Sequence, residues 1–404
     1  MLKRSSGKTI LLIWIAWAAI LFLFQAVVPM RVGVQRPDYA LDWTPGETGA
    51  HSQDGKPYLI EPFLNEHVAW DSEYYLSIAV GGYDDPIMRR IPIPGSEPVS
   101  QNYAFFPLYA QVMRVVMIPL GIFGLNSIAA ATLAGLMVAL IGTLFGMIGL
   151  YDLVREELGE DGAIRAAFYL LIFPTGFFLA QVYTEGLFIG LAFCSLALMH
   201  HKRLFWAALL AALSVWTRAV GVALLIPLAL AWVSEVNWKQ LNWRVFARGW
   251  LVLIPAAAYL AWHFSTWGAN FRAVEENFFR RGLFLMDQSL RTWSQAWGSL
   301  GGANTQASVY YLIEFSAVAL ALAACLLTLR RYPGVALFGL GVLAIAVCSG
   351  WPQSQSRYML AIPSIFILLS RLGKRQSFDR AWTLASVLVM GMLVMLFSFD
   401  MWVA

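Results

Sequence analysis

The chain has 404 residues, of which 59% are hydrophobic and 13% are charged, and its formal net charge is +4. Soluble domains carry about 25% charged residues, so this composition excludes an ordinary soluble protein. Apolar runs of about 20 residues recur along the whole chain, and each is long enough to cross about 30 Å of hydrocarbon. The sequence therefore predicts an all-α polytopic membrane protein, formed as a single domain over residues 1–404, with no nucleic-acid partner.

The first apolar run, about residues 9–29, follows Lys3, Arg4 and Lys8. This pattern predicts an uncleaved anchor with a cytoplasmic N-terminus, and a cleaved signal peptide is the alternative. Residues 30–103 then form a long polar loop that is expected on the outer side. It holds 11 acidic and 5 basic residues, the opposite of a cytoplasmic bias.

Ten later spans bring the expected total to about eleven. They are placed at about 127–150, 164–182, 185–200, 204–217, 219–235, 249–267, 308–329, 334–350, 357–371 and 381–402. With the N-terminal group, this alternation puts six basic clusters on the cytoplasmic side, which supports the register. The five later clusters are Arg155 with Arg165, Lys202 with Arg203, Lys239 with Arg244 and Arg248, Arg330 with Arg331, and Arg371 with Lys374 and Arg375.

Two further segments are expected at the outer surface. Arg114 and Pro119 favour an outer or half-inserted helix over 104–125. A full crossing there would also move the later basic clusters outside. Residues 268–307 mix charges with aromatic side chains, which is typical of an amphipathic helix lying at the interface. We interpret this second extracytoplasmic loop as a surface helix without chemistry.

Most of the unusual polar residues map to the predicted outer side. Asp71 follows Trp70 and opens a stretch in which Tyr74 and Tyr75 begin a helical repeat. On local context Asp71 is an N-cap, because Asp accepts backbone N–H bonds well at that position. Its aromatic and acidic neighbours favour a second interpretation, in which its carboxylate acts as general base toward a sugar hydroxyl.

Three more groups share that side. Asn102, Tyr103 and Phe106 return the outer loop to the bilayer, as interfacial anchors or as the wall of a pocket. Glu185, after Tyr183, either caps the next helix or faces an internal cavity, because exposure to lipid would be costly. Arg218 and Arg357 either snorkel outward or bind a phosphate, for which the planar guanidinium is well suited.

Several motifs are absent from the sequence. There is no phosphate-binding loop, no Gly-x-Ser-x-Gly elbow and no His-Glu-x-x-His. Cys194, Cys325 and Cys348 lie far apart in apolar runs, which argues against disulfides and thiolate metal sites. Asp84 and Asp85 are interpreted as a solvated pair in a polar loop. The sequence therefore predicts no metal, no cofactor and no soluble nucleotide donor.

The same residues carry a resemblance to a known family. The pattern Trp-Asp-x-x-Tyr-x-x-Ile-Ala-x-x-Gly-Tyr spans Trp70 to Tyr83, with one extra residue before Gly82. It is followed by Phe-Phe-Pro-Leu-Tyr from Phe105, Tyr-Thr-Glu at 183–185, Thr-Arg at 217–218 and Ser-Arg-Tyr at 356–358. In this order, over about residues 65–360, the chain resembles the PIG-V family of mannosyltransferases, including its bacterial members, within the GT-C class of membrane glycosyltransferases.

The resemblance implies a GT-C-like helical bundle that transfers a sugar, typically mannose, from a polyprenyl-phosphate carrier on the outer or lumenal face. It also implies that Asp71 is the catalytic residue. The departures from the family pattern are Ala110, where Pro is common, Gly186, where Ser is common, and Ala219 after Thr-Arg. None of them removes a charged group, so they put the substrate in doubt more than the chemistry.

These observations together predict an inverting glycosyltransferase with Asp71 as general base and Arg218 and Arg357 at the donor phosphate. The acceptor is expected to be a glycolipid, glycan or protein hydroxyl, with membrane lipids around the site. The predicted sugar and acceptor pocket comprises Trp70, Tyr74, Tyr75, Asn102, Tyr103, Phe106, Tyr183 and Glu185. A lipid transporter or flippase and a non-catalytic scaffold are the alternatives. Short loops and the absence of a retention signal favour a bacterial plasma membrane over the ER.

Overall fold

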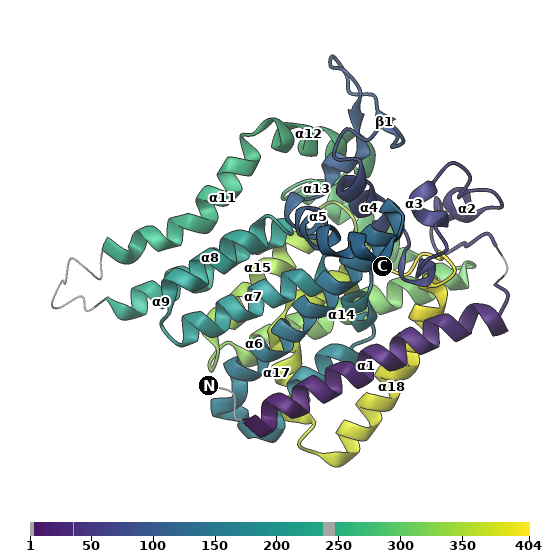
Figure 1. Ribbon diagram of the computed structural model, residues 1–404. Helices are drawn as coiled ribbons and strands as arrows, with labels where there is room; N and C mark the ends of the chain where they lie inside the picture. The colour runs from purple at the N-terminus through teal and green to yellow at the C-terminus, as the bar shows by residue number, and fades with distance from the viewer. Residues whose placement is uncertain (1–3, 35, 237–246) are drawn as a thin grey trace.

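A computed structural model describes residues 4–34, 36–236 and 247–404, and helices make up most of that part (Figure 1). The expected all-α membrane class is confirmed. Lys3, Lys239 and Arg244 of the predicted basic clusters lie outside the described residues. Within the described ranges, four helices are long and apolar enough to cross a membrane, namely α1 (Arg4–Arg31), α6 (Ser127–Ile172), α14 (Thr305–Thr328) and α18 (Gln376–Phe397).

Shorter apolar helices occupy most of the other predicted spans. They are α7 (Glu185–His200), α8 (Leu204–Val215), α9 (Leu225–Glu235) after the 3₁₀ helix η5 (Ala219–Leu224), α11 (Leu253–His263) after η6 (Arg248–Val252), α15 (Pro333–Val347) and α17 (Pro363–Leu372). The predicted boundaries of α7 coincide with the observed ones. Because several of these helices are shorter than a full crossing requires, the total of about eleven spans stays a prediction.

Proline residues explain the two boundaries that the sequence analysis placed wrongly. The span expected over 164–182 is α-helical only to Ile172, because Pro174 follows, and the chain continues as η4 (Gly176–Ala180). The span expected over 357–371 is divided into α16 (Gln355–Tyr358), η8 (Met359–Ala361) and α17, which begins at Pro363. In both places, irregular backbone is buried inside protein rather than exposed to lipid.

The long helix α6 covers the span predicted at 127–150 and the first half of the span predicted at 164–182. Gly159 has φ 72° and ψ 177°, a conformation that suits glycine and breaks the helix there. The Tyr151 hydroxyl donates to the Glu160 carboxylate across this break, which a straight helix would keep far apart. The chain therefore folds back at Gly159, and α6 consists of two helical segments.

Helices α6 and α7 approach each other almost to backbone contact. A Cβ placed on Gly186 would lie 2.1 Å from the Ala139 carbonyl oxygen, and one on Gly190 would lie 2.5 Å from that of Gly142. Small residues allow such close packing in membranes, where dispersion forces hold helices together. This contact fixes the start of α7, and with it Glu185, against the rest of the bundle.

The first outer loop forms a layer at one end of the bundle. It contains α2 (Thr44–Thr48), α3 (Pro57–Ile60), η1 (Asn65–His67), α4 (Ser72–Val80), η2 (Gln101–Ala104) and a small antiparallel pair of strands, β1 (Arg90–Ile91) and β2 (Val99–Ser100). Figure 1 shows these elements at the upper right, and the N-terminal end of α1 at the left. The second outer segment, α12 (Thr266–Val274), η7 (Glu275–Phe279) and α13 (Met286–Gly298), joins the same layer.

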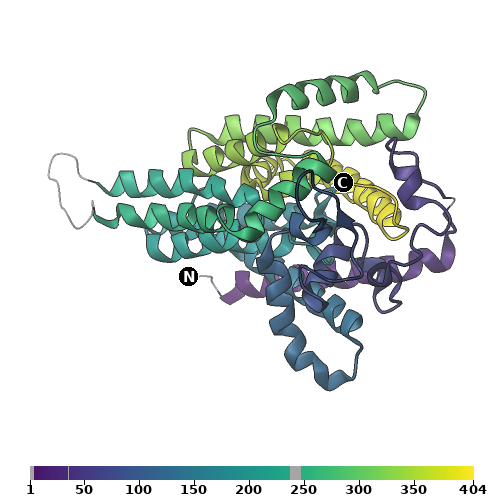
Figure 2. The same ribbon diagram turned by 90° about the horizontal axis from the view of Figure 1, so that it is seen from above.

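The C-terminus lies within this layer, close to the first outer loop (Figure 2). The Trp402 backbone N–H donates to Asp38 at 2.9 Å, and the Trp70 indole donates to the Met401 carbonyl at 3.3 Å. The rings of Trp70, Trp43 and Trp402 meet edge to face, with centroids 4.8–5.7 Å apart. The end of the chain therefore forms part of the outer layer.

The segment 104–125 forms α5 (Pro107–Leu120) and η3 (Gly121–Phe123). Helix α5 packs on α4 and α6, and the Arg114 guanidinium donates to the Ala79 carbonyl at 2.9 Å. Its Val115 and Ile118 side chains are exposed, as suits a lipid-facing edge. Whether this helix crosses the bilayer or lies within one leaflet stays a prediction.

The opposite end of the bundle collects basic residues from several predicted cytoplasmic loops. Arg371 donates to Glu157 at 2.6 Å, and His201 lies 2.6 Å from Asp152. Arg165 donates to the Ser370 carbonyl at 3.2 Å. Loops that the Lys/Arg pattern assigned to one side of the membrane are thus neighbours in space.

Candidate active site

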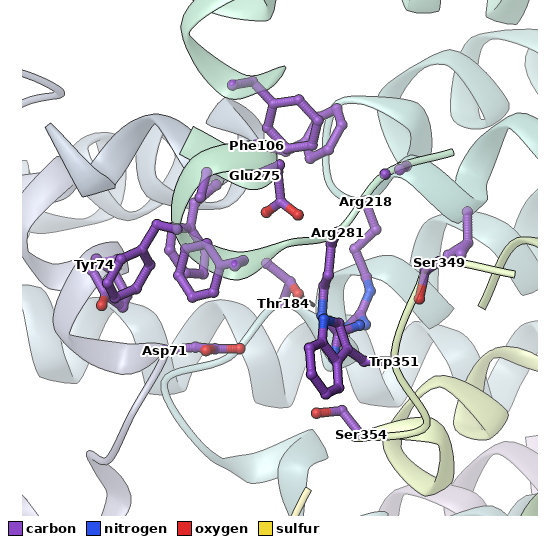
Figure 3. A pocket seen from close by; sticks show the side chains of 18 of the residues that line it. Asp71, Tyr74, Phe106, Thr184, Arg218, Glu275, Arg281, Ser349, Trp351 and Ser354 are labelled. Carbon is purple, nitrogen blue, oxygen red and sulfur yellow. Dashed lines mark hydrogen bonds between the residues drawn. The ribbon is translucent and has the colours of Figure 1, made fainter. Parts of the chain in front are cut away.

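A cavity of about 1680 Å³ lies between the outer layer and the outer ends of the bundle (Figure 3). Segments far apart in sequence contribute to its wall, including α4, η5, α11, α12, η7, α15 and the stretch 349–358. Seven of the predicted site residues line it: Trp70, Asp71, Tyr74, Tyr75, Phe106, Arg218 and Arg357.

Asp71 does not cap its helix. It immediately precedes α4, at the N-cap position, but its side chain makes no capping hydrogen bond. Instead one carboxylate oxygen accepts a hydrogen bond from the Arg357 guanidinium at 2.7 Å. Trp70, with φ +52°, adopts the left-handed conformation just before it, which is rare for a bulky residue. The capping interpretation is therefore wrong, and the backbone turns Asp71 toward the cavity.

Four charged residues form one cluster beside the cavity. Arg357 bonds to Asp71, and its Nε lies 3.4 Å from a Glu185 carboxylate oxygen. Arg218 forms an ion pair with the same Glu185 oxygen and donates to the Thr184 hydroxyl at 3.3 Å. The structure thus brings together four residues that the sequence analysis predicted on one side of the membrane. Their formal charges alternate and sum to zero, which lowers the cost of holding them away from bulk water.

Glu185 is the buried counter-ion of both arginines. It is 2% exposed, and it does not line the cavity, contrary to the expectation that it would face one. Its neighbour Thr184 lines the cavity instead (Figure 3). The second carboxylate oxygen of Glu185 is buried and has no hydrogen-bond partner among the described residues. Its place behind the two guanidiniums suits a residue that holds them in position.

Aromatic rings form the wall next to Asp71. Tyr74 stacks on Phe105 with centroids 4.5 Å apart, and Tyr75 meets the same ring edge to face at 5.1 Å. Phe106 packs against Phe271 of α12 at 5.1 Å. Rings from the first and second outer segments therefore meet across the cavity.

Three predicted pocket residues lie behind this wall rather than on it. The Asn102 amide donates to the Ser77 hydroxyl at 2.8 Å and is fully buried. The Tyr103 hydroxyl donates to Asp84 at 3.0 Å. The Tyr183 hydroxyl donates to the Ala69 carbonyl at 3.0 Å, and its ring lies 5.1 Å from the Arg357 guanidinium. These residues support the loop that carries Asp71 and do not face the cavity.

Of the pair expected to be solvated, Asp84 is exposed, with 66% of its side chain accessible, and Asp85 is not. Asp85 is 2% exposed, and it accepts hydrogen bonds from the Ser77 hydroxyl at 2.8 Å, the Ile87 backbone N–H at 3.0 Å and the Tyr58 hydroxyl. It therefore fastens the end of α4 to the outer loop. Over the described ranges, no group of three or more His, Cys, Asp or Glu side chains is placed to hold a metal ion.

The first half of the second outer segment, residues 268–285, lines the cavity, which the interpretation as a surface helix did not anticipate. Arg272, Glu275 and Arg281 are among the lining residues, and Figure 3 shows the Glu275 carboxylate pointing into the cavity. Burial raises the pKa of Glu275 to about 7, against the lowering effect of Arg281. Burial likewise raises the pKa of Glu73 to about 7. The charged and aromatic composition of 268–307 was the only signal in the sequence for this role.

The cavity continues from the charged cluster between apolar helices. Its lining there comes from η5 and α9 on one side, α11 on another and α15 on the third. The residues are Val222, Ala223, Leu225, Ile226, Tyr259, Gly341, Ala344 and Ile345. One cavity thus joins a charged end at the outer layer to an apolar arm within the bundle.

The family model described as Mannosyltransferase (PIG-V) matches residues 10–231, more than half of the chain. The chain belongs to this family. The match includes Asp71, Glu185 and Arg218, three of the four members of the charged cluster. This confirms the resemblance drawn from the motifs of the sequence.

Individual relatives match over shorter stretches. The GPI alpha-1,6-mannosyltransferase 2 proteins of Cricetulus griseus and Mus musculus are each 30% identical over 171 residues, which is 41% of this chain and 31% of theirs. The match thus spans about a third of the length of these relatives.

Two solved structures resemble the fold. ArnT from Cupriavidus metallidurans bound to undecaprenyl phosphate has 14% identity and a TM-score of 0.44, over 85% of this chain and 74% of its own. The apo oligosaccharyltransferase of Archaeoglobus fulgidus has 11% identity and a TM-score of 0.47, over 97% and 56%. Neither likeness is close enough to assign the role of a residue.

Proposed function

We propose that this protein is an inverting glycosyltransferase that moves mannose from a polyprenyl-phosphate carrier to an acceptor hydroxyl. The reaction would take place at the extracytoplasmic face of the membrane, in a bacterial plasma membrane. The observation that carries the proposal is the placement of Asp71, whose carboxylate lines the cavity and is held by Arg357 at 2.7 Å instead of capping α4. Membership of a mannosyltransferase family supports the reaction class.

The form of the cavity suits a lipid-linked donor. A polyprenyl phosphate has a charged head and a long apolar chain, and the cavity has a charged end and an apolar arm. The head would lie beside Arg218, and the chain would follow the arm past Ala223 and Gly341. Its volume, about 1680 Å³, exceeds the usual 300–1,000 Å³ of small-molecule pockets, and so leaves room for an acceptor.

The proposed step balances without a cofactor. The acceptor oxygen attacks the anomeric carbon, the new C–O bond forms, and the bond to phosphate breaks with its electron pair on the leaving phosphate. The acceptor proton passes to the Asp71 carboxylate. The ion pair with Arg357 keeps that carboxylate oriented before the reaction, and such preorganisation accounts for much of enzymatic rate enhancement.

The charge that develops on the phosphate needs cations that are free to meet it. Arg218 and Arg357 line the cavity, but both are already paired with carboxylates. Arg281 also lines it, and in the part of the chain that the structure describes it has no ion-pair partner, only a 3.2 Å bond to the Gln353 carbonyl. We therefore add Arg281 to Arg218 and Arg357 as a phosphate-binding residue.

The acceptor would be a hydroxyl of a glycolipid, glycan or protein that enters from the outer layer. The aromatic wall of Trp70, Tyr74, Tyr75 and Phe106 would hold the sugars by their apolar faces. Trp70, Tyr74 and Tyr75 come from the segment that carries Asp71. Contact with the sugar would therefore be coupled to the position of the proposed base.

The test uses purified protein with radiolabelled polyprenyl-phosphate mannose and follows loss of label from the carrier. We expect wild type to transfer or slowly hydrolyse the label, and Asp71→Asn to lose at least about 100-fold in rate, as removal of a general base does. Asp54→Asn, at an exposed position of the same loop, is the matched control and should be fully active. Equal rates for wild type and Asp71→Asn, with carrier binding intact, would refute the role of Asp71 and favour transport.

A further inference from the structure

Glu314 is an ionisable residue inside a membrane-spanning helix. It lies in the middle of α14 and is 1% exposed. A carboxylate at such a depth is costly unless its oxygens are fully hydrogen-bonded, and such residues commonly serve a function. Glu314 does not line the cavity, so it takes no direct part in the reaction proposed above.

Glu314 bonds to the Tyr310 hydroxyl and to two backbone N–H groups of a single short segment. One carboxylate oxygen accepts from the Ser354 N–H at 3.1 Å, and the other accepts from the Ser356 N–H at 2.5 Å. The Tyr310 hydroxyl, one turn away on α14, also accepts from the Ser354 N–H at 3.1 Å. Helix α14 therefore holds this segment by hydrogen bonds to two alternate residues, Ser354 and Ser356.

The segment 354–356 has a backbone conformation that needs these hydrogen bonds. Ser354 has φ +66° and ψ 15°, in the left-handed region, which costs about 1 kcal/mol for a residue other than glycine. On the other side of the segment, the Thr175 hydroxyl donates to the Ser356 carbonyl at 2.9 Å. The backbone of 354–356 is thus fixed from two directions.

The residue that follows this segment is Arg357. Its guanidinium bonds to Asp71 at 2.7 Å and lies 3.4 Å from Glu185. The contacts form a continuous chain from Glu314, through the backbone of 354–356, to Arg357 and Asp71. A change in the bonds of Glu314 would therefore move the guanidinium that orients the proposed base.

We propose that Glu314 is a positioning residue of the transfer reaction, which fixes the Ser354 turn and so holds Arg357 against Asp71. The inference rests on the proposed function for its catalytic consequence, but its structural part can be tested alone. Both carboxylate oxygens are required, because an amide at this position would present an N–H₂ group to one of the two backbone N–H donors.

The first test is a double-mutant cycle on the full chain in lipid nanodiscs. Glu314→Gln should lower kcat for label transfer by about 10–100-fold, the effect of a misplaced catalytic group, with a change in carrier KM of less than about threefold. The double variant Glu314→Gln with Arg357→Lys should be no slower than Arg357→Lys alone, because both changes act through one side chain. Losses that multiply in the double variant would overturn the proposal.

The second test is hydrogen exchange of the backbone amides of 354–358, read by mass spectrometry. We expect faster exchange in Glu314→Gln and no change in Thr328→Val, a change on the same helix as Glu314 that removes only a bond to Ser364 of α17 and local bonds within α14. Unchanged exchange in Glu314→Gln would overturn the proposal. If wild type moves no label from the carrier, the proposed function fails, and exchange still decides whether Glu314 holds the segment.

A third variant keeps the proposal testable if Glu314→Gln does not fold. Tyr310→Phe keeps the carboxylate and removes the hydroxyl that accepts from the Ser354 N–H and bonds to Glu314. It should show the same two effects in smaller measure, with kcat lowered about two- to fivefold. If this variant keeps wild-type turnover and wild-type exchange of the 354–358 amides, the proposed hold of α14 on Ser354 is contradicted.

Discussion

The two ends of the bundle hold charged clusters of different character. At the outer end, the Arg357 side chain is 8% exposed and that of Glu185 is 3%, whereas Arg371 and Glu157 at the other end are 23% and 35% exposed. Exposed pairs are screened by water and contribute about 0–1 kcal/mol, while a buried charge must be fully partnered. The exposed pair of Arg371 and Glu157 suits a loop that sets membrane topology. The buried cluster at the outer end is costly to keep charged, which suits a functional site.

The largest expected effect comes from removing the cation shared by two acids. Arg357→Gln would leave Asp71 unpaired and Glu185 with Arg218 alone, at a cost of about 3–5 kcal/mol in the free energy of unfolding. Label transfer should fall by about 1,000-fold or more, because the proposed base also loses its orientation. Thermal unfolding and transfer rate in the same nanodisc preparation measure both. A near-wild-type melting temperature and transfer rate would mean that the outer cluster matters no more than the pair at the opposite end of the bundle.

Arg218→Gln should separate stability from catalysis. Glu185 keeps Arg357 at 3.4 Å, so the fold should survive, while transfer falls about 100-fold if Arg218 stabilises the leaving phosphate. Steady-state kinetics with the labelled carrier measure the loss. Arg248→Gln, at an exposed position, is the control and should be unaffected. Full activity of Arg218→Gln would restrict this arginine to a structural role.

The outer end should also respond to pH in a direction set by Glu275. Burial raises its pKa from 4.5 to about 7, so the folded protein holds a proton that the unfolded chain releases. The free energy of unfolding should therefore fall as pH rises from about 4.5 to about 7, and this contribution should stay constant beyond those limits. Melting temperatures across that range should drop by a few degrees in wild type, and by less in Glu275→Gln. Identical pH profiles would contradict the raised pKa.

The smallest effect is expected at the inner end. Arg371→Gln removes a part-exposed pair with Glu157, and should change the free energy of unfolding by less than about 1 kcal/mol. Label transfer should be unchanged, because this pair lies at the opposite end from the cavity. A loss of activity comparable to that of Arg218→Gln would mean that the two ends are coupled.

The sequence predicted most of the helices because apolar length and Lys/Arg bias are local signals. The bounds of α7 were predicted correctly, since charged or polar residues flank a continuous apolar run. The predicted span over 164–182 runs past the stop at Ile172, because the buried 3₁₀ segment that follows is as apolar as a helix. Pro174 was the local signal that marks this boundary.

For the site, the gathering of Asp71, Glu185, Arg218 and Arg357 followed from topology, but their pairing did not. Asp71 and Arg357 are 286 residues apart, and which acid meets which base depends on side-chain directions that no pattern encodes. Glu314 gave no signal at all, because a single acid in an apolar run shows neither its depth nor its partners. The helix at 268–307 was foreseen, and the face it turns to the cavity was not.

The place of the C-terminus has a practical consequence for how the protein is handled. Met401 and Trp402 contact the first outer loop, Trp402 lines the cavity, and Val403 and Ala404 are buried. An affinity tag or fluorescent protein fused directly after Ala404 would disturb the packing of Trp402 against Trp43 and Trp70, the residue next to Asp71. A fusion before α1 would emerge at the far end of the molecule, where Ser6 bonds to Glu160. Assays of transfer should therefore carry the tag at the N-terminus.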